Sequence, residues 1–199
     1  MKVISDGGMV SCNSKDTIDA IMLTKNIDYI DGIKLDVRIS NDNILVLAEN
    51  EELNKFSLSN KKVSTCNYDY LKKIKFPSHI FKYYIPTLEE VLLKYNNDKI
   101  IVLELYNSEK IDILLKNLYH LLLKYSYKYY FMSKSNDVIN KLKDNELNKV
   151  GTILLDNEYK IINDYQIDDE IPFDGDFFLI TEYPEKIRKR YFHSTKSDY

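Results

Sequence analysis

The stretch that decides the fold is Asp31-Gly-Ile-Lys-Leu-Asp-Val-Arg38, which is followed by Ile44-Leu-Val-Leu-Ala-Glu49-Asn-Glu-Glu-Leu53. Both halves predict strands, in which successive side chains point to opposite faces. Lys34 and Asp36 therefore share one face of the first strand, and the apolar side chains take the other. Charges inside a buried strand are unfavourable unless they are paired or functional. We interpret this charged pair as the first sign of a site.

Composition and charge predict one domain over residues 1–199. The chain is 44% hydrophobic and 30% charged, which is enough for a full core. Within this domain we expect an irregular insertion at 54–84 and a frayed tail at 192–199. The 28 Lys and Arg residues are outnumbered by 31 Asp and Glu and are scattered along the chain, which argues against a nucleic-acid partner.

The sequence predicts a cytoplasmic protein. No apolar run is long enough for a signal peptide or a membrane span. Cys12 and Cys66 do not form a Cys-x-x-Cys motif, so we interpret both as free thiols in a reducing compartment.

Strand-like runs alternate with amphipathic helical patterns along the chain, which predicts a parallel sheet with right-handed crossovers. The predicted strands of this sheet are 2–5, 32–37, 100–105, 128–133, 150–155 and 176–181. A tight loop, Asp6-Gly7-Gly8, follows the first strand. In Ile85-Pro-Thr-Leu-Glu-Glu-Val-Leu92, Thr87 and Glu90 predict a capping box at the start of a helix.

These motifs resemble the glycerophosphodiester phosphodiesterase family. Residues 31–37 are similar to the family's D-G-I-E-L-D-V, residues 85–92 match its I-P-T-L-E-E-V-L, and residues 174–184 resemble its closing strand. The resemblance implies an α/β fold, a (β/α)-barrel of the TIM-barrel type. A full barrel typically has about 250 residues. Because this chain has 199, we expect a trimmed or incomplete barrel.

The missing part of the barrel is expected after residue 155. Only about 20 residues separate Leu155 from Asp174, so we expect the usual further strand and its helix to be missing or reduced here. The barrel should therefore be open or narrowed between 150–155 and 176–181. An open sheet edge invites pairing, so a homodimer that covers this gap is one expectation.

The resemblance also implies a site at the carboxyl ends of the strands. In the family, three carboxylates hold a divalent cation, an Arg grips the phosphate, and two His act as acid and base. Asp36 and Glu104 stand at metal-ligand positions, but Lys34 stands where the family has a metal-binding Glu. Asp6 and Glu49 stand at the two His positions.

Two further substitutions fall in the first loop. Gly7 stands in place of the phosphate-binding Arg, and Lys15 stands in place of a site Glu. The chain thus keeps the spacing of the family's motifs but has a different residue type at most of the positions that form the family's site.

Three interpretations of this site are open. In the first, Lys34, Asp36 and Glu104 form an ion-pair cluster in the cleft, with no cofactor. In the second, Asp36 and Glu104 keep a residual metal site. In the third, Asp6 and Glu49 form a new acid–base pair for catalysis.

The histidines add one candidate at most. His120 lies in a predicted helix beside Leu residues, and His193 lies in the tail. His79 falls in the insertion, which the family places over the barrel mouth, so it alone could reach the cleft.

Two functions follow from these interpretations. The first is a phosphodiesterase-like pseudoenzyme that binds a phosphorylated polyol ligand or a protein partner. The alternative is a divergent, active phosphodiesterase that hydrolyses glycerophosphodiester-type substrates with a substituted acid–base pair, and only this one needs calcium or magnesium.

Overall fold

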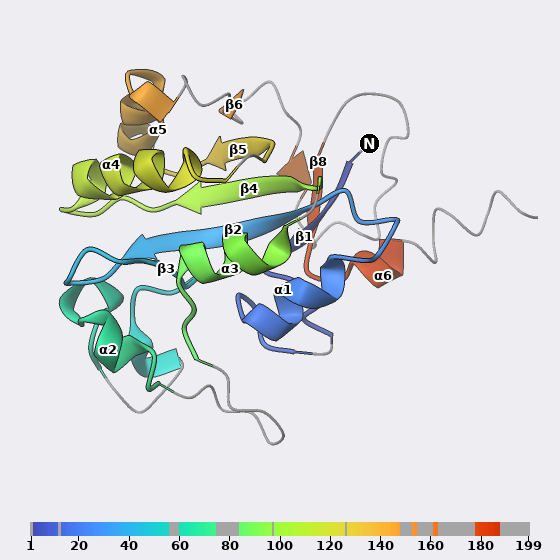
Figure 1. Ribbon diagram of the computed structural model, residues 1–199, viewed down its shortest axis with the longest axis horizontal. Helices are drawn as coiled ribbons and strands as arrows, with labels where there is room; N and C mark the ends of the chain where they lie inside the picture. The colour runs from blue at the N-terminus through green and yellow to red at the C-terminus, as the bar shows by residue number, and fades with distance from the viewer. Residues whose placement is uncertain are drawn as a thin grey trace, which may run out of the picture.

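The sequence Gly32–Ile39 forms β2, a strand of eight residues at the centre of the sheet. The computed structural model describes residues 2–11, 13–55, 60–74, 84–96, 98–125, 127–147, 153–154, 161–162 and 178–187. β1 (Lys2–Asp6) and β4 (Ile100–Leu105) pair with β2 on either side, both in parallel (Figure 1). The predicted neighbourhood of 32–37 and 100–105 is therefore confirmed.

The remaining parallel strands extend this sheet in both directions. They are β5 (Tyr129–Met132), β6 (Ile153–Leu154), β7 (Ile161–Ile162) and β8 (Phe178–Thr181). The strand order is β6-β5-β4-β2-β1-β8-β7. Among the described residues no pairing joins the two end strands, β6 and β7. The sheet is thus a trimmed, open (β/α)-barrel, as predicted.

Two details differ from the prediction. The opening lies between β6 and β7, because the strand expected to be missing or reduced is present as the short β7, which pairs in parallel with β8. A two-residue strand is too short to leave a periodic signal in the sequence. The second strand of the opening motif is also shorter than its pattern. β3 covers only Leu45–Leu47, runs antiparallel to β2, and ends before Glu49.

Helices cover the outer face of the sheet, with α3 (Leu88–Tyr95) alongside β2 and α4 (Ile111–Leu122) alongside β4 in Figure 1. Three further helices are α1 (Ile18–Thr24), α5 (Asn136–Lys143) and α6 (Pro184–Ile187). None of the helices in the described part of the chain is long and apolar enough to cross a membrane.

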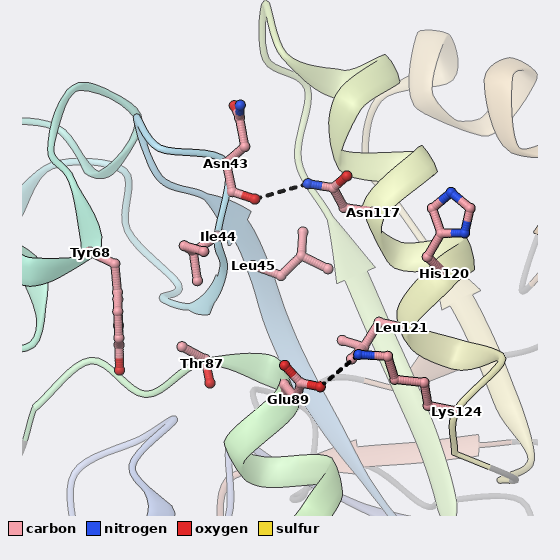
Figure 2. A pocket seen from close by; sticks show the side chains of 10 residues that line it. All are labelled: Asn43, Ile44, Leu45, Tyr68, Thr87, Glu89, Asn117, His120, Leu121 and Lys124. Carbon is pink, nitrogen blue, oxygen red and sulfur yellow. Dashed lines mark hydrogen bonds and ion pairs between the residues drawn. The ribbon is translucent and has the colours of Figure 1, made fainter.

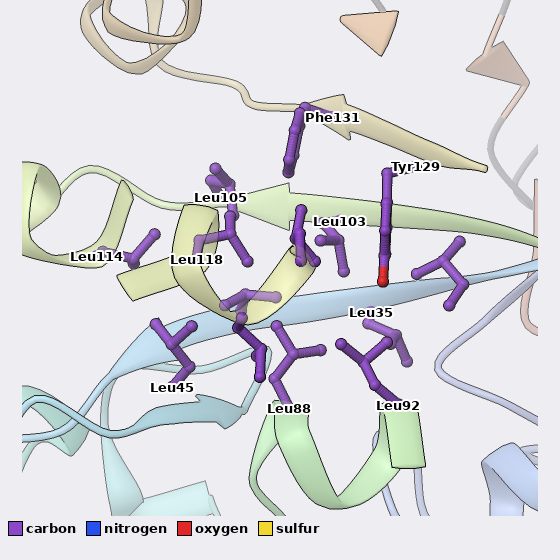
Figure 3. Close-up of a cluster of buried hydrophobic side chains, with 14 of the residues drawn as sticks. Leu35, Leu45, Leu88, Leu92, Leu103, Leu105, Leu114, Leu118, Tyr129 and Phe131 are labelled. Carbon is purple, nitrogen blue, oxygen red and sulfur yellow. The ribbon is translucent and has the colours of Figure 1, made fainter. Parts of the chain in front are cut away.

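The two faces of β2 have different neighbours. Leu35 and the other odd-numbered apolar residues of β2 join the main core, where Leu103 of β4 and Leu88 of α3 pack against them (Figure 3). Burial of each such side chain contributes about 1.5–3 kcal/mol. The even-numbered face, with Lys34 and Asp36, therefore turns to the barrel interior.

Aromatic side chains show how strongly the sheet curves. Tyr130 of β5 and Phe178 of β8 belong to strands that are not neighbours, yet their rings are 4.9 Å apart between centroids in an edge-to-face contact. They pack with Ile4 and Val102 in the barrel interior. The curvature therefore brings strands that are not neighbours in the sheet into contact across the barrel interior.

The predicted insertion at 54–84 is partly described. After η1 (Leu53–Lys55), it contains η2 (Val63–Thr65) and α2 (Tyr68–Leu71). These elements bury a small core of their own, to which Cys66 contributes a buried free thiol. The segments 56–59 and 75–83, and the predicted tail 192–199, lie outside the described residues.

The capping box at α3 has the predicted form. Thr87 Oγ1 accepts a hydrogen bond from the Glu90 N–H at 3.0 Å, and the Glu90 carboxylate accepts one from the Thr87 N–H at 2.9 Å. Both bonds satisfy N–H groups that the helix itself leaves without a partner.

Thr87→Ala should lower the free energy of unfolding by about 1 kcal/mol, because it removes the capping oxygen. Thr87→Ser keeps the oxygen and should remain within about 0.5 kcal/mol of the wild type. Urea denaturation followed by circular dichroism measures both. Equal stability of the Ala variant and the wild type would show that the cap does not contribute.

Candidate functional site at the barrel mouth

Three neighbouring strands place charged side chains in the barrel interior. In the parallel register, Asp6 of β1 lies opposite Lys34 of β2, and Asp36 of β2 lies opposite Glu104 of β4. Since side chains alternate along a strand, these residues share the interior face. Strand pairing alone therefore brings together four of the site residues predicted from the sequence.

A tight loop after β1 brings a fifth charge to this place. Gly8 has a φ of +102°, and a Cβ there would lie 2.4 Å from the backbone carbon of Ala20. Only glycine can bring the loop this close to α1. The chain then returns to the mouth, where Gly7 N–H donates to the carbonyl of Lys34 at 2.9 Å and Lys15 joins the cluster.

The Lys34 ammonium group is the centre of the cluster. Lys34 is 5% exposed, and its Nζ lies 3.0 Å from Asp6 Oδ1, 3.0 Å from Asp36 Oδ1 and 2.7 Å from Glu104 Oε2. Burial by itself lowers the pKa of Lys34, but the three carboxylates outweigh burial and raise the pKa well above its usual range. Lys34 is therefore a permanent cation here and not an amine nucleophile.

Asp36 is the most enclosed acid. It is fully buried and accepts hydrogen bonds from Lys34 and from the Tyr106 hydroxyl. Burial by itself raises the pKa of Asp36. Lys34, Lys15 and Tyr106 lower the pKa by more than burial raises it, so the pKa falls to about 2. The Arg38 guanidinium carbon lies 4.0 Å from the centroid of the Tyr106 ring. This cation–π contact holds the Tyr106 hydroxyl in position to donate to Asp36.

Lys15 is a second cation, nearer the solvent. Its Nζ lies 3.0 Å from Asp6 Oδ2, 3.5 Å from Asp36 Oδ2, 3.5 Å from Glu49 Oε1 and 3.6 Å from Glu182 Oε1. Burial lowers the pKa of Lys15, and the surrounding acids reverse this and raise it. The outer acids are more exposed, with half of the Glu49 side chain open to solvent.

Asp16 is a buried acid in the loop that follows β1. It is 3% exposed and adopts a φ of +59°. Burial raises its pKa well above the usual range, and the nearby Asp36 raises it further. Burial and the neighbouring carboxylate therefore act in the same direction on the pKa of Asp16.

Acids outnumber bases in the cluster. Five carboxylates, those of Asp6, Asp36, Glu49, Glu104 and Glu182, contact lysines at the mouth. Three ammonium groups face them, and the third, Lys134, is 82% exposed and 3.9 Å from Glu104. Among the described residues, the charged side chains at the mouth therefore carry a net negative charge.

The residues at the mouth do not fit a divalent cation. The Lys34 ammonium lies within salt-bridge distance of both Asp36 and Glu104, the two carboxylates expected to bind a metal. Among the described residues no group of three or more His, Cys, Asp or Glu side chains is arranged to hold a metal ion. The Lys34 ammonium thus lies between the carboxylates at which the resemblance implies a metal ion.

Of the three histidines and Cys12, only the histidine of α4 can be placed in the structure. His120 is exposed on α4, on the outer face of the barrel. His79, His193 and Cys12 lie outside the described residues. Sequence reasoning missed Glu182 entirely, and it treated Lys15 only as a substitution. The signal for Glu182 was its place directly after the last strand.

In its fold the chain is similar to solved structures of glycerophosphodiester phosphodiesterases. A phosphodiesterase from Oleispira antarctica, in complex with the product sn-glycerol-3-phosphate, has a TM-score of 0.71 at 16% identity, over 95% of this chain and 96% of its own. A glycerophosphodiester phosphodiesterase from Parabacteroides distasonis has a TM-score of 0.67 at 18% identity, over 98% of each chain. One from Agrobacterium tumefaciens has 0.65 at 16% identity, over 93% and 97%.

No protein-family profile and no curated protein matches the chain. The barrel fold implied by the sequence motifs is confirmed by the solved structures, which share it at low identity.

Replacing Lys34 by Met should destabilise the protein by about 3–5 kcal/mol, because it leaves buried carboxylates without their cation. Lys134→Met is the matched control. Its ammonium is exposed and 3.9 Å from Glu104, so its loss should change stability by less than about 0.5 kcal/mol. Chemical denaturation at neutral pH measures both, and equal effects of the two variants would contradict the central role of Lys34.

Stability should fall as the pH falls from about 4 to about 2. The pKa of Asp36 is about 2 in the folded protein, against an ordinary value of 3.8. As the pH falls, the Asp36 carboxylate is therefore protonated in the unfolded chain before it is protonated in the folded protein. This difference removes about 2 kcal/mol from the free energy of unfolding. Asp36→Asn should flatten this part of the curve of unfolding free energy against pH. The exposed Asp137→Asn serves as control, and an unchanged slope in Asp36→Asn would contradict the assignment.

Proposed function

We propose that this chain is a phosphodiesterase-like protein that does not hydrolyse phosphodiesters, with a built-in ammonium group in place of a metal ion. The single observation that carries the proposal is the position of Lys34 Nζ, 2.7–3.0 Å from three carboxylates. A divalent cation at this position would have to displace a buried, permanently charged lysine.

The charge at the mouth also opposes a phosphodiester substrate. The resemblance implies an Arg that grips the phosphate, and Gly7 stands at that position. The acids outnumber the lysines, and each lysine already contacts at least one carboxylate. A phosphate group would therefore meet net repulsion at close range, where charges interact strongly.

The alternative, an active enzyme with Asp6 and Glu49 as acid and base, has less support. Both side chains contact the same Lys15 ammonium, at 3.0 and 3.5 Å. Proton transfer needs a group that can reach the substrate in the right protonation state. Carboxylates engaged by a permanent cation are poorly placed for this role.

The kind of binding partner follows from the same charge balance. A phosphorylated polyol at the mouth is disfavoured by the excess of acids, so of the two partners expected from the sequence we favour a protein partner. A homodimer across the open sheet edge and a cytoplasmic location remain predictions from the sequence.

Hydrolysis and metal binding test the proposal directly. The protein should show no turnover of glycerophosphocholine or bis(p-nitrophenyl) phosphate with calcium or magnesium, and no rise in melting temperature with either ion, because a ligand stabilises only the state that binds it. Calorimetric titration with glycerol 3-phosphate should give no heat of binding. An active phosphodiesterase of the same fold is the positive control.

Lys34→Glu sharpens the test. Without metal the variant should be less stable than the wild type, because it crowds four carboxylates together. Calcium should restore its stability, while hydrolysis stays absent because Asp6, Gly7 and Glu49 are unchanged. A wild-type protein that binds magnesium tightly and cleaves a glycerophosphodiester would overturn the proposal.

A further inference from the structure

The lysines at the barrel mouth do not satisfy its acids. Lys15 is shared by four carboxylates, and only its contact with Asp6, at 3.0 Å, has the length of a hydrogen bond. Its distances to the other three carboxylates are 3.5–3.6 Å. An ammonium group has three N–H donors, so Lys15 cannot serve four carboxylates at once. The described part of the mouth therefore has more acceptor capacity than its own cations use.

Two buried carboxylate oxygens of the cluster receive no hydrogen bond from the described residues. They are Asp36 Oδ2 and Glu104 Oε1, on side chains that are 0% and 3% exposed. Each faces a lysine nearer the rim, since Asp36 Oδ2 lies 3.5 Å from Lys15 Nζ and Glu104 Oε1 lies 3.9 Å from Lys134 Nζ. A buried acceptor without a donor is unfavourable. The unmet acceptors thus lie on the side from which an outside donor would arrive.

The outermost acids can be reached from the solvent. Glu49 follows β3 and Glu182 follows β8, and their side chains are 50% and 38% exposed. Because both carboxylates contact the same Lys15 ammonium group, at 3.5 and 3.6 Å, one incoming organic cation can contact both. A carboxylate accepts up to about four hydrogen bonds. The long contact with Lys15 therefore leaves room for a further donor at Glu49.

The hollow on the outer wall of the barrel, between α3 and α4, is by contrast balanced in charge (Figure 2). Its volume is about 400 Å³, and the acid and the lysine that line it are Glu89 and Lys124. These two side chains pair with each other at 3.1 Å. The hollow therefore favours neither sign of charge, whereas the mouth favours a cation.

The arrangement at the mouth fits a guanidinium group. Its planar fork of five N–H donors matches carboxylates in pairs of hydrogen bonds, which an ammonium group or a metal ion does not. An arginine side chain is also long enough to place this fork inside a cleft while its backbone stays outside. Interfaces between proteins are enriched in arginine for these reasons.

We propose that the barrel mouth is the docking surface for a protein partner that inserts an arginine side chain between Glu49 and Glu182. The inference rests on the proposed function, in which the mouth holds no metal ion and the chain binds a protein. Lys34 holds the inner acids in place, and the two outer acids receive the guanidinium group.

An arginine peptide tests the proposal on the full chain. The probe is acetyl-Arg-Gly-Arg-Gly-Arg-amide, titrated by calorimetry at low ionic strength, where exposed charges are least screened. Saturable binding of one peptide per chain is expected. Glu49→Gln and Glu182→Gln should each weaken binding severalfold, and together about tenfold, because each removes one exposed ion pair.

Lys15→Gln should act in the opposite direction. It removes the cation that competes with the peptide for Glu49 and Glu182, so it should strengthen binding severalfold. A variant that merely failed to fold would not gain affinity. This variant therefore keeps the test decisive even if the variants of the acids are unstable.

Matched controls lie at the opposite end of the barrel. Asp28 and Asp98 are exposed and precede β2 and β4. Asp28→Asn combined with Asp98→Asn changes the net charge as much as the double variant at the mouth, but it should leave the affinity for the peptide unchanged. The same peptide with citrulline in place of arginine has nearly the same shape without the charge, and it should not bind.

Three outcomes would overturn the proposal. They are the absence of saturable binding, equal weakening by the control pair and the mouth pair, and equal affinity for the citrulline peptide. Spermine that binds more tightly than the peptide would assign the mouth to a small polyamine and would also overturn it. Turnover of glycerophosphocholine, measured on the same preparation, decides the proposed function separately. Absent turnover together with absent peptide binding would contradict only the docking of an arginine.

Discussion

The contact of one ammonium group with three carboxylates is the interaction on which the barrel mouth depends. Lys34, which is 5% exposed, forms ion pairs with Asp6, Asp36 and Glu104 at distances of 2.7–3.0 Å. Isolated charges at such depth would be strongly unfavourable. The pairing in turn depends on strand register, since a slip of one residue would turn every side chain of a strand to the opposite face. The ion pairs of the site therefore form only in the observed strand register.

The substitutions at the mouth largely offset one another in charge. Relative to the residues implied by the family resemblance, Glu-to-Lys exchanges at positions 15 and 34 add four positive charges. Acids in place of His at positions 6 and 49, Gly7 in place of Arg, and the proposed loss of a divalent cation together remove five. The set is therefore one charge more negative than the residues and the metal ion that the resemblance implies. Under the proposed function, the lysines supply most of the positive charge that a metal ion would bring.

Local patterns predicted much of this arrangement. Alternation in 31–38 placed Lys34 and Asp36 on one face, and the spacing of Thr87 and Glu90 predicted the capping box, because both depend on residues close in sequence. The pairing of Lys15 with Glu182 could not be predicted, because it joins a loop to the far end of the chain. The position of β7 could not be predicted, because two residues are too few to show the alternation of apolar and polar side chains that indicates a strand.

The most direct measurement of the central claim is a crystal structure from crystals soaked in calcium, with anomalous scattering to locate the ion. The account predicts no calcium between Asp36 and Glu104, and the Lys34 ammonium within salt-bridge distance of both carboxylates. Calcium bound by these two carboxylates, with the Lys34 side chain displaced, would contradict it.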